Sequence, residues 1–217
     1  MNRSAKFGEE VPGYSIPVLN EREIRASAGI LFVFMFISLM LIIFKGNFVM
    51  IKYVIILFLI DMIIRVFISP KYSPTLIIGR LIVSRQNPEY VGAAQKKFAW
   101  MIGIALATMM FFLMVVLNSY SVITGLTCLI CLIFLFFESA FGICLGCVAY
   151  KLFYKEKAQY CPGEICDVKA KQDIQKVSLT QVVIVLGFIA IIILMINLLN
   201  DILTEKPSNL WQLLKLK

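Results

Sequence analysis

The chain has 217 residues, of which 60% are hydrophobic and only 16% are charged, and its formal net charge is +8. Soluble domains average about 45–50% apolar and about 25% charged residues, so this composition argues against a water-soluble globular protein. The long apolar runs leave no soluble segment large enough to form a nucleic-acid-binding domain. The positive charge instead predicts a basic face at a membrane surface.

Apolar runs of roughly 20 residues, enough to cross a bilayer as a helix, recur along the chain. They follow a polar N-terminal segment, residues 1–26, in which Asn20 can cap a helix that begins at Glu21. Residues 75–85, between the second and third runs, predict a short amphipathic helix lying in the membrane interface. The runs themselves predict five transmembrane helices, at about 27–44, 48–68, 98–117, 122–143 and 180–201.

The predicted fold is therefore an all-α membrane protein with a four-helix transmembrane core at residues 27–150. A polar loop with two cysteines follows at 151–179, and residues 180–217 contain the fifth transmembrane helix and a tail. Lysine and arginine gather in the N-terminal segment, in the loop between the second and third spans, and in the loop after the fourth. The positive-inside rule then predicts a cytoplasmic N-terminus and an external C-terminus.

The six cysteines fall into three close pairs, and two of these pairs bracket a basic loop at the end of the fourth predicted span. They are Cys144-Leu-Gly-Cys147 and Cys161-Pro-Gly-Glu-Ile-Cys166. Such pairs exchange disulfides, carry sulfur as a persulfide, or bind a metal. The predicted cytoplasmic side is a reducing compartment, so permanent structural disulfides are not expected there.

Three interpretations of these four cysteines remain open: dithiol or persulfide chemistry, a structural four-thiolate zinc or iron–sulfur site, and simple packing. The chain has no histidine, so a transition-metal site would have to use sulfur and carboxylate ligands. One point counts against thioredoxin-like chemistry at Cys144 and Cys147. The C-terminal end of a helix disfavours a thiolate, unless Gly142 or Gly146 breaks the helix early.

The third pair, Cys128 and Cys131, lies inside the fourth apolar run, and we interpret both residues as packing residues. The alternative is a thiol route that continues into the bilayer. Against this alternative, a continuous helix would separate Cys131 from Cys147 by roughly 24 Å, too far for direct exchange.

Ionisable residues at membrane depth are candidate functional groups. Asp61 and Arg65 are spaced to pair within one helix, whereas Glu138 has no partner in its own helix, so Arg65, Arg22 or Arg25 is expected to reach it. The alternatives are a buried structural ion-pair network and a proton or anion site. Lys96 and Lys97 are predicted to anchor in the headgroups, with Trp100 in the aromatic belt.

The basic loop residues predict contact with lipid headgroups or, alternatively, a funnel that attracts a small sulfur oxyanion or an acidic partner to the cysteines. These residues are Arg65, Lys71, Arg80, Arg85, Lys96 and Lys97.

Several segments together resemble a bacterial inner-membrane family known as a domain of unknown function, numbered 4395. They are residues 17–25 (PVLNEREIR), 60–67 (IDMIIRVF), 70–74 (PKYSP), 88–92 (PEYVG), 97–100 (KFAW) and 137–150 (FESAFGICLGCVAY). The resemblance covers roughly residues 11–167 and implies an inner-membrane protein with a four-helix core. It brings no established activity, and it suggests sulfur-handling partners of the thioredoxin or rhodanese type.

The leading hypothesis is a cytoplasm-facing thiol relay in which Cys144 and Cys147 exchange disulfide or persulfide sulfur with Cys161 and Cys166. Arg65, paired with Asp61, would bind an anionic donor together with Arg80 and Arg85, and Glu138 would move a proton. This relay requires no cofactor. The alternatives are a transporter or channel subunit for a small sulfur compound, and a non-enzymatic scaffold whose four cysteines bind zinc or an iron–sulfur cluster. The expected surroundings are the lipid bilayer, and no nucleic acid is involved.

Overall fold

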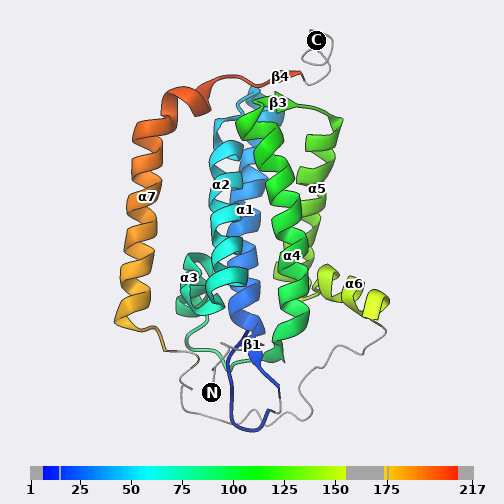
Figure 1. Ribbon diagram of the computed structural model, residues 1–217, viewed down its shortest axis with the longest axis vertical. Helices are drawn as coiled ribbons and strands as arrows, with labels where there is room; N and C mark the ends of the chain where they lie inside the picture. The colour runs from blue at the N-terminus through cyan, green and yellow to red at the C-terminus, as the bar shows by residue number, and fades with distance from the viewer. Residues whose placement is uncertain (1–6, 15, 155–173, 175, 210–217) are drawn as a thin grey trace.

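The computed structural model describes residues 7–14, 16–154, 174 and 176–209. Figure 1 shows a bundle of long helices, α1, α2, α4 and α5, with α7 standing beside it. The helices are α1 (Glu21–Lys45), α2 (Val49–Ile63), α3 (Pro74–Ile82), α4 (Ala93–Met110), α5 (Val122–Phe136), α6 (Leu145–Tyr154) and α7 (Leu179–Thr204). Short π-helical or 3-10 segments extend or link them: η1 (Ile64–Ile68), η2 (Pro70–Tyr72), η3 (Phe111–Val116) and η4 (Phe137–Phe141).

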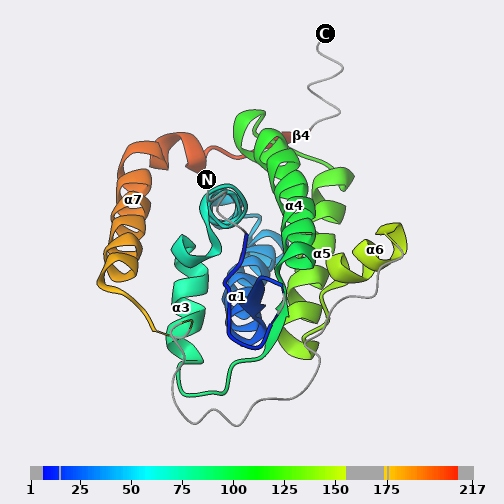
Figure 2. The same cartoon turned by 60° about the horizontal axis from the view of Figure 1, so that its bottom comes forward.

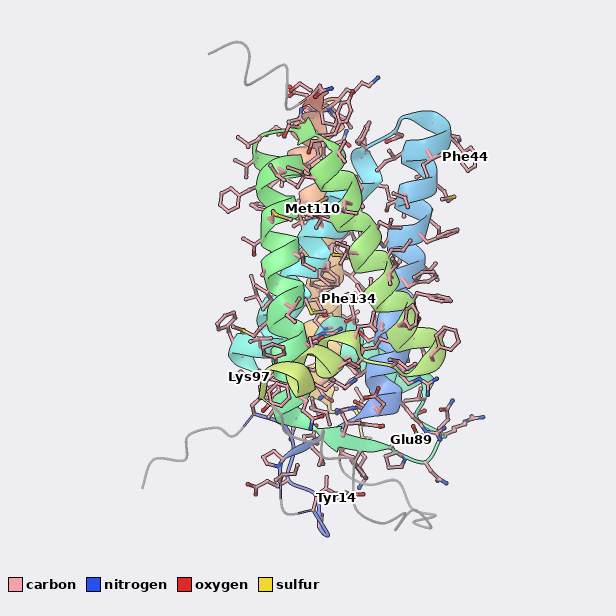
Figure 3. All side chains as sticks on the ribbon, turned by 90° about the vertical axis from the view of Figure 1, so that its right-hand side faces the viewer. Tyr14, Phe44, Glu89, Lys97, Met110 and Phe134 are labelled. Carbon is pink, nitrogen blue, oxygen red and sulfur yellow. The ribbon has the colours of Figure 1, made fainter. Side chains whose placement is uncertain are left out.

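Four helices are long and apolar enough to cross a membrane: Glu21–Lys45, Ala93–Val116, Val122–Phe141 and Leu179–Thr204. Their outer surfaces are apolar, as at Phe44, which points away from the bundle (Figure 3). The helix α2 lies among them and carries Lys52 and Asp61, and η1 extends it with Arg65. All three side chains are buried inside the protein. The predicted four-helix core with a further C-terminal helix is therefore confirmed.

Local sequence explains where the first helix begins and ends. The Asn20 side chain accepts a hydrogen bond from the Arg22 amide, 3.2 Å away, as predicted for a helix cap. Gly46 ends α1 in the left-handed region at φ 59°, where a residue without a Cβ is favoured. The tight turn that follows lets α2 return beside α1.

Two small sheets lie at opposite ends of the bundle. At one end, β1 (Val18–Asn20) pairs antiparallel with β2 (Tyr90–Gly92), with Leu19 opposite Val91. At the other end, β3 (Ser119–Tyr120) pairs in parallel with β4 (Ser208–Asn209). The first sheet fixes the starts of α1 and α4 next to each other, which brings Glu21 of α1 close to Lys96 of α4.

The predicted interfacial helix at 75–85 corresponds to α3, but this helix packs into the end of the bundle. A Cβ at Gly79 would lie 2.6 Å from the Glu23 carbonyl oxygen of α1, so only glycine allows this approach. Arg80 on the same helix is buried against Glu23. Amphipathicity alone did not distinguish a helix on lipid from a helix on protein.

Helix α7 stands apart from the bundle along most of its length (Figures 1 and 2). It is held near its two ends: the Gln181 side chain donates to the Lys71 carbonyl over 2.9 Å, and Lys52 Nζ donates to the Glu205 carbonyl over 2.7 Å. Lys52 also donates to Asn118 Oδ1 at 2.7 Å. The middle of α7 is exposed and apolar, as expected for a helix surrounded by lipid.

Candidate thiol site

The fourth span ends in a sharp break before the cysteine pair. The η4 segment finishes at Phe141, and Gly142 takes a left-handed conformation at φ 68°. The Arg25 guanidinium of α1 lies against Gly142, about 3.2 Å from where a Cβ would be, and donates to the Ala140 carbonyl. Because the chain turns here, α6 leaves the axis of α5 and crosses beside α4 (Figure 3).

The break places the Cys144–Cys147 pair at the N-terminal end of α6. Cys144 directly precedes the helix, and its sulfur accepts a hydrogen bond from the Cys147 amide, 3.3 Å away. The expectation that both cysteines end the fourth helix is therefore wrong, and the early break at Gly142 is the reason. Amide groups at a helix N-terminus favour negative charge on sulfur, so the dipole objection no longer applies.

Both cysteines are nearly covered: Cys144 is 8% exposed and Cys147 is 7% exposed. Close packing of α6 on α4 causes part of this burial, since a Cβ at Gly146 would lie 2.5 Å from the Cβ of Ala99. A hydrogen bond with the Cys147 side chain, burial and the Glu138 carboxylate raise the pKa of Cys144, while Lys96 lowers it. Cys144 is therefore protonated at neutral pH and needs a base to react.

A cavity of about 60 Å³ lies beside Cys144 and is bounded by α1, α2, α4, α5 and α6. Its polar wall contains Arg65, Glu138 and Cys144, and its apolar wall includes Trp100 and Cys131. A water molecule needs roughly 10–15 Å³ measured in this way, so the cavity has room for a few waters or a small reacting group. Cys131 and Cys144 thus line the same cavity. The separation of roughly 24 Å expected between Cys131 and Cys147 assumed an unbroken helix, which the turn at Gly142 rules out.

A buried chain of charges runs from the cavity to α1. Lys96 Nζ lies 2.7 Å from Glu138 Oε1 and 2.7 Å from Glu21 Oε2, and the Lys96 side chain is 3% exposed. Two predictions are corrected here: the partner of Glu138 is Lys96 and not an arginine, and Lys96 is not a headgroup anchor. Lys97, its neighbour, is exposed and lies over the Phe7 ring.

A signal for Lys96 is present in the sequence in retrospect. Adjacent helical residues point about 100° apart, so Lys96 and Lys97 cannot face the same environment. Lys96 shares its face with Trp100, one turn further along α4. That face packs into the bundle, and Trp100 is buried there, not placed in an aromatic belt.

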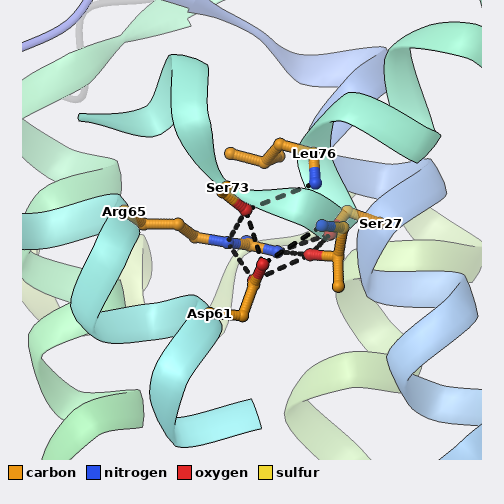
Figure 4. A network of polar contacts seen from close by, with 6 residues as sticks. Ser27, Asp61, Arg65, Ser73 and Leu76 are labelled. Carbon is orange, nitrogen blue, oxygen red and sulfur yellow. Dashed lines mark hydrogen bonds and ion pairs between the residues drawn. The ribbon is translucent and has the colours of Figure 1, made fainter. Parts of the chain in front are cut away.

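The predicted pair of Asp61 and Arg65 is confirmed and belongs to a larger network (Figure 4). Arg65 Nε lies 2.8 Å from Asp61 Oδ2, and Asp61 also accepts from the Ser73 and Thr75 hydroxyls, each at 2.7 Å. Arg65 donates to Ser27 and Thr75, and its guanidinium lies 5.2 Å from the centre of the Trp100 ring. This network fixes the wall of the cavity.

The other predicted anion-binding arginines differ in their surroundings. Arg80 is buried between Glu9, at 3.3 Å, and Glu23, at 3.1 Å, so its guanidinium is already paired with two carboxylates. Burial raises the pKa of Glu9, while Arg80 and Lys71 lower it. Arg85 is exposed. Attraction of an anionic donor stays a prediction for these residues.

The loop pair, Cys161 and Cys166, lies outside the described residues. Within the part of the chain that the structure describes, no three His, Cys, Asp or Glu side chains are grouped as metal ligands. Cys128, like Cys131, is buried in α5.

The core of the chain is similar to a known protein family. A family model described as "Domain of unknown function (DUF4395)" matches residues 19–155. The chain belongs to this family. The DUF4395 match includes α1 to α6, and so contains Cys144, Cys147, Lys96 and Glu138, whereas α7 lies beyond it. No curated protein and no solved structure matches the chain.

Proposed function

We propose that the protein is a membrane-embedded thiol–disulfide relay whose reactive centre is the Cys144–Cys147 dithiol. The observation that carries this proposal is the position of the pair at the start of α6, where the Cys147 amide donates to the Cys144 sulfur beside a cavity. A thiolate is the species that attacks a disulfide, and a helix N-terminus stabilises it.

In the proposed reaction, one thiolate of the pair attacks a sulfur of a partner disulfide. A mixed disulfide forms and one partner thiolate leaves. The second cysteine attacks the mixed disulfide, closes the Cys144–Cys147 disulfide and releases the second partner thiol. Two electrons pass to the partner, and the two protons of the dithiol end on the partner sulfurs.

Glu138 is the proposed base for Cys144. Its carboxylate lies on the wall of the same cavity, where a water molecule has room to connect the two groups. The Cys144 S–H bond breaks and an O–H bond forms on Glu138, which then passes the proton to the leaving partner thiolate.

The proposed first partner is the Cys161–Cys166 pair, which follows α6 in the chain. A thioredoxin- or rhodanese-like carrier would exchange with that pair on the cytoplasmic side, given the proposed orientation of the loops. The apolar side chains that line the cavity, such as Trp100, would keep bulk water away from the exchanging sulfurs.

The test uses full-length protein in nanodiscs, with Cys161 and Cys166 replaced by serine so that the loop thiols do not report. An aromatic disulfide that releases a coloured thiolate serves as the partner. The parent protein is expected to release two thiolates per chain and to end with an internal disulfide. Cys144→Ser and Cys147→Ser should each release one at most and remain covalently linked to the reagent.

Cys128→Ser in the same background is the matched control, because Cys128 is a cysteine of similar burial that the proposed reaction does not use. It should still release two thiolates per chain. The proposal fails if the parent protein forms only a stable mixed disulfide, or if Cys147→Ser still completes the exchange.

A further inference from the structure

The ammonium group of Lys96 is a buried charge that has no part in the proton and sulfur transfers of the proposed reaction. It is held between two carboxylates, Glu21 from α1 and Glu138 from η4, each at 2.7 Å. Glu138 lines the same cavity as Cys144, and the positive charge of Lys96 lowers the pKa of the Cys144 thiol. The contact of Gly146 with Ala99, one turn along α4 from Lys96, keeps the start of α6 against this part of α4.

We propose that Lys96 sets the reactivity of the Cys144–Cys147 dithiol by stabilising its thiolate, and that Glu21 opposes this effect. The inference rests on the proposed function of the pair. Lys96 is a positioning residue in this scheme: it touches Glu138 and acts on the sulfur through its charge, without taking part in a bond-forming step.

Charge balance explains why a lysine is needed at this position. Lys96, Glu21 and Glu138 together carry one net negative charge, which disfavours a second one on sulfur. When Glu138 accepts the Cys144 proton, the net charge of the whole group does not change. The negative charge moves from the carboxylate to the sulfur, and the ammonium remains close enough to compensate it. Without Lys96, the same transfer would leave a thiolate uncompensated in a poorly hydrated site.

Two charged groups act on Cys144, which directly precedes α6: Glu138 from η4 and Lys96 from α4. Behind them on α1 lie Glu21, which pairs with Lys96, and Arg25, whose charge acts on Glu21. Removing a positive charge from this set should make the thiolate harder to form. Removing a negative charge should make it easier. The two changes therefore have opposite predicted effects on one measurable quantity.

The experiment measures the rate of alkylation by iodoacetamide against pH, in full-length protein whose other four cysteines are serine. Lys96→Met is expected to move the profile to higher pH by about one unit, which is about a tenfold lower rate on its rising limb. Glu21→Gln is expected to move it to lower pH by a similar amount. A merely structural role for the charges would loosen α6 in both variants and speed alkylation at every pH without opposed shifts.

The double variant Lys96→Met/Glu21→Gln keeps the net charge of the Lys96, Glu21 and Glu138 cluster. It serves as a second test of Lys96 if the single variant Lys96→Met does not fold. Its profile is expected to lie at higher pH than that of Glu21→Gln alone. The inference about Lys96 is overturned if the two single changes shift the profile in the same direction, or if the double variant matches Glu21→Gln. Release of two thiolates in the disulfide assay would show, in that case, that the relay itself still stands.

Discussion

Asp61→Ala is expected to lower the free energy of unfolding by about 3–5 kcal/mol, the usual cost of removing one partner of a buried ion pair. Asp61 is completely buried and accepts hydrogen bonds from Arg65, from two hydroxyl groups and from the Thr75 amide at 3.1 Å. Its loss leaves the Arg65 guanidinium charged and without its carboxylate beneath Trp100. The cavity wall would also lose the network that positions it.

Reversible unfolding in mixed micelles, with rising fractions of denaturing detergent, measures this loss. Asp201→Ala is the matched control, because Asp201 is an exposed carboxylate on α7, and its change should stay within about 0.5 kcal/mol. The double variant Asp61→Leu/Arg65→Met should recover much of the stability by removing both charges. Equal stability of Asp61→Ala and the Asp201 control would contradict the role assigned to the network.

Gly146→Ala is expected to expose the dithiol, with alkylation of Cys144 and Cys147 at least about tenfold faster at constant pH. The added Cβ would lie 2.5 Å from the Ala99 Cβ and 2.8 Å from its Cα, and neither atom belongs to a flexible side chain. The start of α6 must therefore move away from α4. This movement would separate the sulfurs from Glu138. In the disulfide assay, closure of the internal disulfide should therefore be slower.

Gly125→Ala provides the comparison, since a Cβ at Gly125 on α5 meets no atom within 4 Å. Its alkylation rate should equal that of the parent protein. Ala99→Gly in the Gly146→Ala background removes one of the two close atoms and should restore part of the burial. If Gly146→Ala leaves the thiols as protected as before, the contact between α4 and α6 does not control access to the site.

Features that depend on near neighbours in the chain could be predicted from the sequence. The apolar runs are long enough to place the transmembrane helices, Asn20 has the side chain that caps α1, and Asp61 and Arg65 are one helical turn apart. In each case the interacting groups lie within a few residues of each other, so helical geometry alone brings them together. The close spacing of Cys144 and Cys147 likewise keeps the two residues together, at the start of α6.

The partners in the site were decided by the tertiary structure. Glu138 and Lys96 lie on different helices, and only the packing of α4 against the end of α5 brings them within 2.7 Å. The position of Cys144 at a helix start depends on the turn at Gly142, which Arg25 of α1 supports. A glycine inside an apolar run does not by itself mark the end of a membrane helix, because glycine is tolerated within such helices and a break needs neighbouring protein groups to satisfy the freed backbone. The sequence by itself thus determined which segments are membrane helices, through apolar length. The tertiary structure decided which buried charges and thiols meet, because buried charges are stable only with partners that distant segments supply.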